Sequence, residues 1–97
     1  MAVLSQDELG ARLGELAGWG QGEAEIHKEF ELGSFPDAIS FVVRLSYEAE
    51  ARNHHPDLDV RYNQVRVVLS THSEGGVTEK DLELASAIES LALPAGD

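Results

Sequence analysis

The sequence predicts an α+β fold, in which an antiparallel sheet carries helices packed on one face. Three segments, at 5–16, 34–52 and 78–91, have apolar residues spaced three and four apart, as amphipathic helices do. Between these segments lie extended stretches in which apolar and polar residues alternate, joined by short turns. The expected order is helix, strand or hairpin, helix, two strands and helix, within a single domain over residues 1–97.

The composition narrows the possible classes of function. Seven basic against eighteen acidic side chains give the chain a net charge of −11, which opposes binding to nucleic acid. The absence of cysteine excludes disulfides, thiolate metal sites and a cysteine nucleophile. The N-terminal residues do not form a basic region followed by an apolar run, and no stretch is apolar enough to span a membrane. We therefore expect a cytoplasmic protein without a membrane or nucleic-acid partner.

The first predicted helix begins at a capping box. Ser5 is followed three residues later by Glu8, so that each side chain can accept a hydrogen bond from the other's backbone N–H. Leucines then recur at helical spacing, at Leu9, Leu13 and Leu16. We expect Gly18 to end this helix.

The first predicted strand follows from the pattern AEIHKEFEL at 24–32. Ile26, Phe30 and Leu32 share one face, which Lys28 interrupts, while the opposite face is mostly charged. Alternation with one polar face is typical of a half-exposed antiparallel strand. Trp19, just upstream, either begins a partner strand or caps the core.

The second predicted helix has the clearest signals. Ser34 is a candidate N-cap, and Pro36 suits the first turn. An apolar stripe follows, at Ala38, Phe41, Val42, Leu45 and Ala49. Pro56 is expected to end the helix and to set the adjacent His54 and His55 toward one cleft.

A hairpin and a final helix complete the predicted fold. Two extended segments flank residues 62–64, and the second, from Val65 to Thr71, is expected to carry His72 at its end. Thr78 and Asp81 are spaced as in another N-terminal cap. The apolar positions of the final helix are Leu82, Ala85, Ile88 and Leu91.

Three histidines form the candidate site. A short hairpin would return His72 toward His54 and His55, at the end of the second helix. Such a set can hold Zn²⁺ with an open position, but adjacent histidines rarely both reach one ion, so the metal alternative is the weaker one. Proton transfer suits the set better, because histidine titrates near neutral pH and one ring can donate while another accepts.

Polar neighbours could support these histidines. Glu50 lies one helical turn before the histidine pair and could orient an imidazole. Asp81 either caps the final helix or faces the cleft, and Ser70 and Thr71 are either ordinary strand residues or contacts to a polar ligand. His27 lies on a charged strand face, where we expect an exposed histidine without function.

The segment from Glu50 to Asp81 resembles the signature region of the pterin-4a-carbinolamine dehydratases. The matching residues are Glu50, His54, His55, Pro56, Tyr62, Asn63, Val65, Ser70, Thr71, His72, Gly76 and Asp81. Upstream, the resemblance extends to Gly18, Trp19, Phe30, Phe35, Ala38 and Phe41. It therefore covers nearly the whole chain, and the spacing from the double histidine to the third histidine is specific.

The resemblance implies a two-layer fold with a four-stranded antiparallel sheet, assembled as a dimer or tetramer. It implies a 4a-hydroxytetrahydrobiopterin dehydratase that forms quinonoid dihydropterin without a metal or other cofactor, linked to an aromatic amino-acid hydroxylase. The catalytic acid and base would be found among His54, His55 and His72. The substrate-binding residues would be Glu50, Asn53, Pro56, Ser70, Thr71 and Asp81. Some relatives are dimerisation or assembly factors, and this non-enzymatic role is the alternative.

Three positions depart from the family pattern. Many animal members have Asp at position 53 and Trp at position 58, where this chain has Asn53 and Leu58. Lys80 stands where arginine is frequent, so the charge is kept and the bidentate geometry is lost. Because all three histidines are retained, we expect activity to survive these changes.

Overall fold

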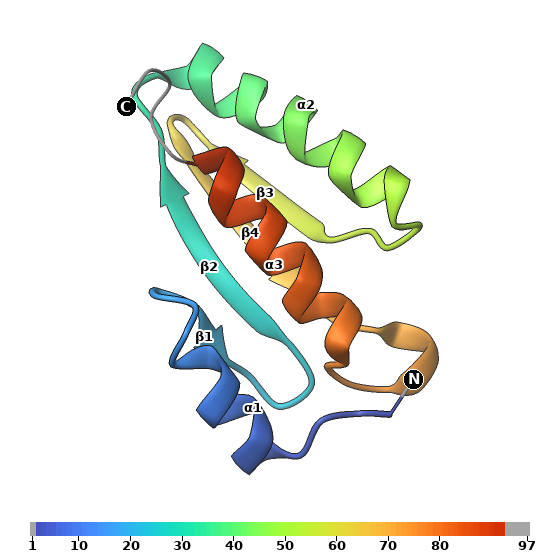
Figure 1. The fold of residues 1–97 in the computed structure, drawn as a ribbon. Coiled ribbons are helices and arrows are strands. Elements are labelled where there is room, and N and C mark those ends of the chain that lie inside the picture. Colours follow the sequence, from blue (N-terminus) through green and yellow to red (C-terminus); the bar gives the residue numbers. More distant parts are fainter. Residues whose placement is uncertain (1, 93–97) are drawn as a thin grey trace.

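The structure, a computed structural model, describes residues 2–92, which form one sheet and three α-helices (Figure 1). The elements in chain order are α1 (Gln6–Leu13), β1 (Gly20–Gln21), β2 (Ile26–Glu31), α2 (Phe35–Ala51), β3 (Asp57–Arg61), β4 (Gln64–Leu69), the 3₁₀ turn η1 (His72–Glu74) and α3 (Glu79–Ala92). No helix in these residues is both long and apolar enough to cross a membrane.

The four strands pair antiparallel in the order β1-β2-β4-β3. The central pair is in register from Ile26 opposite Leu69 to Glu31 opposite Gln64. Figure 1 shows α2 and α3 packed side by side over one face of this sheet. The predicted α+β class, with a four-stranded antiparallel sheet and helices on one face, is therefore confirmed.

The core lies between the helices and the sheet. The predicted stripe of α2 faces it, since Ala38, Phe41 and Leu45 have no exposed surface and Ala49 is 2% exposed. Buried residues of the other elements include Leu9, Ile26, Val65, Val67, Leu69, Leu84, Ala85 and Ile88. The buried apolar surface supplies the main driving force for folding.

α1 begins where the sequence predicts but ends sooner. Ser5 Oγ accepts from the N–H of Glu8 at 3.1 Å, and Glu8 Oε1 accepts from the N–H of Ser5 at 3.0 Å, which is the predicted capping box. The helix ends at Leu13 with Gly14 as its cap, so the prediction that Gly18 ends it is wrong. Glycine loses the most backbone freedom in a helix, which favours the earlier end. Gly18 instead turns the chain with a φ of 88°.

Lys28 interrupts the apolar face of β2 without leaving a charge unpaired in the core. Its Nζ lies 4.8 Å from the ring centroid of Phe30 and donates to the carbonyl of Ala17 at 2.9 Å. The same ammonium group pairs with Glu89 of α3, whose Oε1 also accepts from Trp19 Nε1 at 2.9 Å. The lysine stem thus lies along apolar surface, while its charged end ties β2 to α3.

α2 ends in a Schellman motif centred on Asn53. Asn53 is left-handed, with a φ of 48°, and its N–H donates to the carbonyl of Glu50 at 3.1 Å. The next N–H, of His54, donates to the carbonyl of Ala49 at 3.0 Å. Asparagine is one of the few non-glycine residues that adopt this conformation readily. Asn53, and not Pro56 as predicted, therefore ends the helix and directs the chain into the histidine pair.

Replacing Asn53 by valine is expected to lower the free energy of unfolding by about 1–2 kcal/mol, because a β-branched side chain is strained at positive φ. Glycine at the same position is expected to change the stability by no more than about 0.5 kcal/mol. Urea denaturation of the two variants measures the difference. Equal free energies of unfolding for the valine and glycine variants would mean that the left-handed conformation at position 53 does not contribute to stability.

β4 ends earlier than predicted. The expected strand ran from Val65 to Thr71, whereas β4 ends at Leu69. Thr71 instead forms an isolated bridge with Gly76, to whose carbonyl its N–H donates at 2.9 Å. His72 therefore begins the turn η1 and does not lie at the end of a strand.

An ion pair between α1 and α3 gives one pH-dependent contribution to stability. Arg12 donates to both carboxylate oxygens of Glu79, at 2.5 and 2.9 Å, and this lowers the pKa of Glu79 from its ordinary 4.5. A carboxylate with a lowered pKa stabilises the fold above its unfolded pKa, and loses this contribution as the pH falls through its folded pKa.

We therefore expect Glu79→Gln to be less stable than the wild type at neutral pH, and the difference to vanish as the pH falls below 4.5. Because the pair is exposed, the difference should be small. Thermal unfolding measured from pH 3 to 7, with the exposed Glu83→Gln as the matched control, tests this expectation. A Glu79→Gln deficit that persists at the acid end would contradict it.

Candidate active site

A buried aspartate on α3 organises the candidate site. Asp81 has no exposed surface. Its Oδ1 accepts a hydrogen bond from His54 Nε2 at 2.5 Å. Its Oδ2 accepts from the hydroxyl of Thr71 at 2.8 Å and from the N–H of Thr78 at 2.9 Å. Of the two alternatives that the sequence left open for Asp81, the structure therefore shows the cap of the final helix, and the buried carboxylate also holds one of the candidate histidines.

Three separate segments meet at this carboxylate. His54 follows α2, Thr71 follows β4, and Thr78 precedes α3. His54 is 9% exposed and Thr71 is 4% exposed. A buried carboxylate is tolerated when it is paired and hydrogen-bonded, and this one has a donor from each segment. The polar cluster thus joins the ends of α2, β4 and α3.

The bond to Asp81 identifies the free nitrogen of His54. A carboxylate only accepts, so Nε2 carries the proton and Nδ1 of the neutral ring has a lone pair. Within residues 2–92, Nδ1 has no hydrogen-bond partner, yet no side-chain nitrogen or oxygen is buried without one. Nδ1 therefore reaches solvent. A nitrogen open to solvent, on a ring held by a carboxylate, can act as a general base.

His55 lies at the surface, whereas its neighbour His54 is buried. Its Nε2 is 2.7 Å from Glu50 Oε1, and the two side chains are 57% and 79% exposed. The expected interaction of Glu50 with an imidazole therefore forms with His55. The prediction that Pro56 sets both rings toward one cleft is therefore wrong, because one ring is buried against Asp81 and the next is exposed beside Glu50.

The remaining predicted site residues belong to neither of the two histidine–carboxylate pairs. His72 is exposed, and no hydrogen bond joins it to His54 or His55 in the described part of the chain. Ser70 donates from Oγ to the carbonyl of Ala24 at 2.7 Å. The last two predicted residues are exposed Asn53 and half-buried Pro56. Among residues 2–92, no group of three or more histidine, aspartate or glutamate side chains is arranged to hold a metal ion.

Thr78 also belongs to the cluster around Asp81, although it is not among the site residues predicted from the sequence. Its position as a helix cap was predicted, but its hydroxyl also lies 2.8 Å from that of Thr71. The available signal was weak, because Thr71, Thr78 and Asp81 lie in a segment, 71–81, in which Val77 is the single apolar residue. Such polar residues must find partners if the segment is buried.

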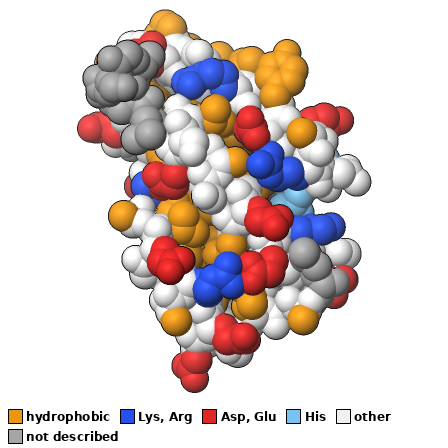
Figure 2. Space-filling view, viewed as in Figure 1, with side chains coloured by type: hydrophobic (Ala, Val, Ile, Leu, Met, Phe, Trp, Pro, Cys, Tyr) orange, Lys and Arg blue, Asp and Glu red, His pale blue; other side chains and the backbone are white. Residues whose placement is uncertain are grey.

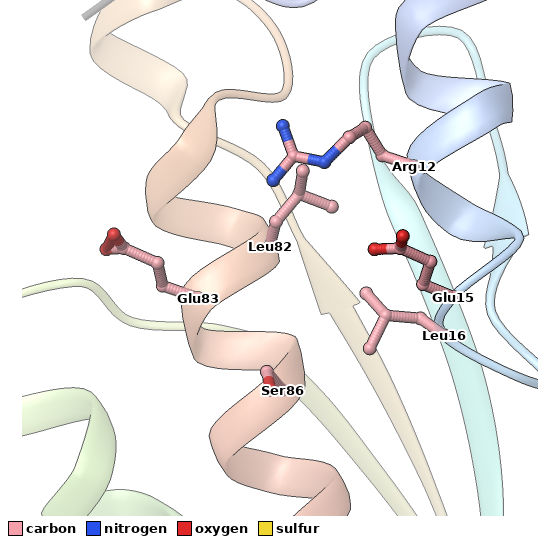
Figure 3. Close-up of a pocket in the computed structure, with 6 residues that line it drawn as sticks. All are labelled: Arg12, Glu15, Leu16, Leu82, Glu83 and Ser86. Atoms are coloured by element: carbon pink, nitrogen blue, oxygen red, sulfur yellow. The ribbon is translucent and has the colours of Figure 1, made fainter.

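A surface cavity of about 270 Å³ lies between α1 and α3 (Figure 3). It is lined by Arg12, Glu15, Leu16, Leu82, Glu83 and Ser86. On the face that α3 occupies, Figure 2 shows apolar surface in hollows between acidic and basic side chains. None of the predicted site residues lines the cavity of Figure 3, so the hydrogen-bonded cluster around Asp81 identifies the candidate site.

Three comparisons point to one family. Residues 2–91 match the family model of pterin 4 alpha carbinolamine dehydratase. A relative from Roseiflexus castenholzii, provisionally named pterin-4-alpha-carbinolamine dehydratase, is 49% identical over 90 residues, which are 93% of this chain and 97% of the relative. A crystal structure of a transcriptional coactivator/pterin dehydratase from Brucella melitensis has a TM-score of 0.90 at 34% identity, over 94% of this chain and 99% of that chain.

A more distant structure shares the fold. It is a pterin dehydratase-like protein described as a RuBisCO assembly factor in the alpha-carboxysome. Its TM-score is 0.67 at 23% identity, and the match covers 77% of this chain and 89% of that chain. At this identity the likeness concerns the fold alone.

Proposed function

Because the chain belongs to the pterin 4 alpha carbinolamine dehydratase family, we propose that it removes water from 4a-hydroxytetrahydropterin, giving quinonoid dihydropterin. The observation that carries the proposal is the buried pair of His54 and Asp81, whose Nε2 and Oδ1 atoms are 2.5 Å apart. The pair leaves one imidazole nitrogen open to solvent, and a second histidine–carboxylate contact joins His55 to Glu50. Two imidazoles, each with a carboxylate partner, suit a reaction made of two proton transfers.

The reaction requires one proton to be delivered and one to be removed. The C4a–O bond breaks, and the departing hydroxyl takes up a proton to leave as water. The N5–H bond also breaks, its electrons form the C4a=N5 double bond, and its proton goes to a base. The pterin therefore loses water without oxidation or reduction, and side chains that titrate near neutral pH are sufficient for both transfers.

His54 is the proposed base. Its Nδ1 accepts the N5 proton, and the positive charge that forms on the ring is stabilised by Asp81 at Nε2. His55 and His72 are the candidates for the acid, since both are exposed and can exchange protons with solvent.

The substrate-binding residues that the family resemblance implies are Glu50, Asn53, Pro56, Ser70, Thr71 and Asp81. The four of them that are not buried, Glu50, Asn53, Pro56 and Ser70, are the proposed pterin contacts. Asn53, Glu50 and His55 are exposed at the end of α2, so a ligand can reach them. Asp81 is fully buried, and it would therefore act on the substrate only through His54.

A hydroxylase-coupled assay tests the proposal. A phenylalanine hydroxylase generates the 4a-carbinolamine, and its decay is followed by absorbance with and without this protein. Acceleration at micromolar protein is expected, and no acceleration would overturn the enzymatic proposal. Single His55→Ala and His72→Ala variants then identify the acid, whose loss is expected to slow the reaction by about 10²-fold.

The proposed physiological role is recycling of tetrahydrobiopterin in the cytoplasm. An aromatic amino-acid hydroxylase would produce the 4a-hydroxy compound, and the product formed here would be passed to a reductase. No metal or other cofactor is needed for the proposed step. A high negative charge is compatible with a substrate that is small and carries no phosphate.

The second candidate function is a non-enzymatic dimerisation or assembly module. It is favoured by a row of large apolar side chains on the outer face of α2. The row consists of Phe35, Ile39, Val43 and Tyr47, at a spacing of four residues, and these side chains are 40–73% exposed. Residues four apart share one face of a helix. We propose that a second copy of this chain covers the row, in a dimer or tetramer that is compatible with catalysis.

Val43→Glu is expected to convert the assembled protein to a smaller species, because it places a charge in the middle of the apolar row. Light scattering after size-exclusion chromatography gives the mass directly. Ala11→Glu, which changes an exposed residue of α1, is the matched control and should keep the wild-type mass. An unchanged mass for Val43→Glu would exclude the row as the contact between copies.

A further inference from the structure

We propose that Thr71 and Thr78 are positioning residues. The Thr71 hydroxyl, itself held by the Thr78 hydroxyl, and the backbone N–H of Thr78 clamp Asp81 Oδ2, so that Oδ1 stays directed at His54. The kinetic consequence of this clamp rests on the proposed function, whereas the clamp itself is a property of the folded protein. The proposal assigns a role to Thr78 and gives Thr71 a role other than contact with the substrate.

The protons in the cluster have one possible order. The single hydroxyl proton of Thr71 is donated to Asp81 Oδ2 at 2.8 Å. The Oγ1 atoms of Thr71 and Thr78 are 2.8 Å apart, so Thr78 must supply the proton between them. Thr78 Oγ1 in turn accepts from the N–H of Lys80 at 3.3 Å. The chain of donors therefore runs from the α3 backbone through both hydroxyls to the carboxylate.

This order divides the two oxygens of Asp81 between two tasks. Oδ2 is held by the hydroxyl of Thr71 and the backbone N–H of Thr78, whereas the hydrogen bond to Oδ1 comes from His54. A carboxylate held at one oxygen by two donors has little freedom to rotate. The polarised chain of hydroxyls strengthens each bond within it. The ring of His54 is thereby held with Nε2 toward Asp81 and Nδ1 toward solvent.

The burial of Thr71 argues against a direct contact with the substrate. Thr71 is 4% exposed and Thr78 has no exposed surface. The proton of Thr71 is already donated to Asp81, and its oxygen already accepts from Thr78. The hydroxyl of Thr71 therefore has no proton to offer a pterin without breaking its bond to Asp81.

Nuclear magnetic resonance tests the clamp without the reaction. The Nε2 proton of His54 is followed in protein labelled with ¹⁵N, and its exchange with water is measured. In Thr71→Val, this proton is expected to exchange about tenfold faster, the equivalent of one hydrogen bond to a charged group. Thr71→Ser keeps the hydroxyl and should restore slow exchange. The backbone amide of Val67, in the core of β4, reports any general loosening and should not change.

Steady-state kinetics tests the consequence for the proposed reaction. Thr71→Val is expected to lower kcat about tenfold with KM within about twofold of the wild type, and Thr71→Ser should recover kcat. Thr78→Val keeps the N–H bond to Asp81 and should lower kcat less, with recovery in Thr78→Ser. If Thr71→Val fails to fold, Thr78→Val and Thr78→Ser replace it in both the exchange measurement and the kinetic measurement.

Two results would overturn the clamp. One is unchanged exchange of the His54 Nε2 proton in the folded valine variants. The other is a raised KM with unchanged kcat in Thr71→Val, which would mean that this hydroxyl binds substrate. If the wild-type protein catalyses no dehydration at all, the proposed function fails, and the exchange measurement alone decides whether the clamp exists.

Discussion

His54→Gln is expected to slow dehydration of the 4a-carbinolamine by about 10²-fold or more, the usual scale for loss of a general base. Glutamine retains an N–H donor that can reach Asp81, so the buried carboxylate keeps a partner. It has no nitrogen that takes up a proton near neutral pH, so the N5 proton must pass to water. The hydroxylase-coupled assay measures the rate, and urea denaturation shows whether the variant is folded.

A matched control is available on the sheet. His27 lies on β2 opposite Val68 of β4, where it is half-buried and not exposed as predicted, and its side chain makes no hydrogen bond within the described part of the chain. His27→Gln makes the same chemical change and is expected to keep the wild-type rate. A His54→Gln rate within about threefold of the wild type, in a folded protein, would mean that the base is another residue.

The starts of the helices could be predicted because their signals are local. Ser5 and Glu8 bind each other's backbone N–H across three residues, and Ser34 Oγ accepts from the N–H of Asp37 at 3.2 Å. Alternation along β2 and β4 likewise needs only the side chains of one strand. The ends of α1 and β4 were less predictable, because there a weak local preference competes with packing against other elements.

The partners within the candidate site could not be predicted from spacing. Glu50 precedes both histidines, and only the left-handed turn at Asn53 decides that it meets His55. Asp81 reaches His54 across 27 positions of the chain, a contact that depends on how α2 and α3 pack. The histidine set itself was visible in the sequence, whereas the burial of one ring and the exposure of the next required the fold.

Asp81→Asn is expected to remove most of the activity while leaving the protein folded, because the side-chain amide can bind the surrounding donors in only one orientation. The N–H of Thr78 is a fixed donor that points at Oδ2, so the amide oxygen of asparagine is expected to occupy that position. Its NH₂ group then faces His54 Nε2. That nitrogen can accept a hydrogen bond only if the ring moves its proton to Nδ1. The lone pair of the base would then be buried against the amide, and solvent would meet an N–H.

The expected loss of rate is again about 10²-fold or more. The position of the proton on the His54 ring reveals the cause of this loss. Correlation of ring protons with ¹⁵N should place the His54 proton on Nε2 in the wild type and on Nδ1 in Asp81→Asn. Asp81→Ala provides the contrast, because it leaves the donors of His54, Thr71 and Thr78 buried without an acceptor. Its free energy of unfolding should fall by about 3–5 kcal/mol. A folded Asp81→Asn variant with an unchanged proton position and the wild-type rate would show that the carboxylate has only a structural role.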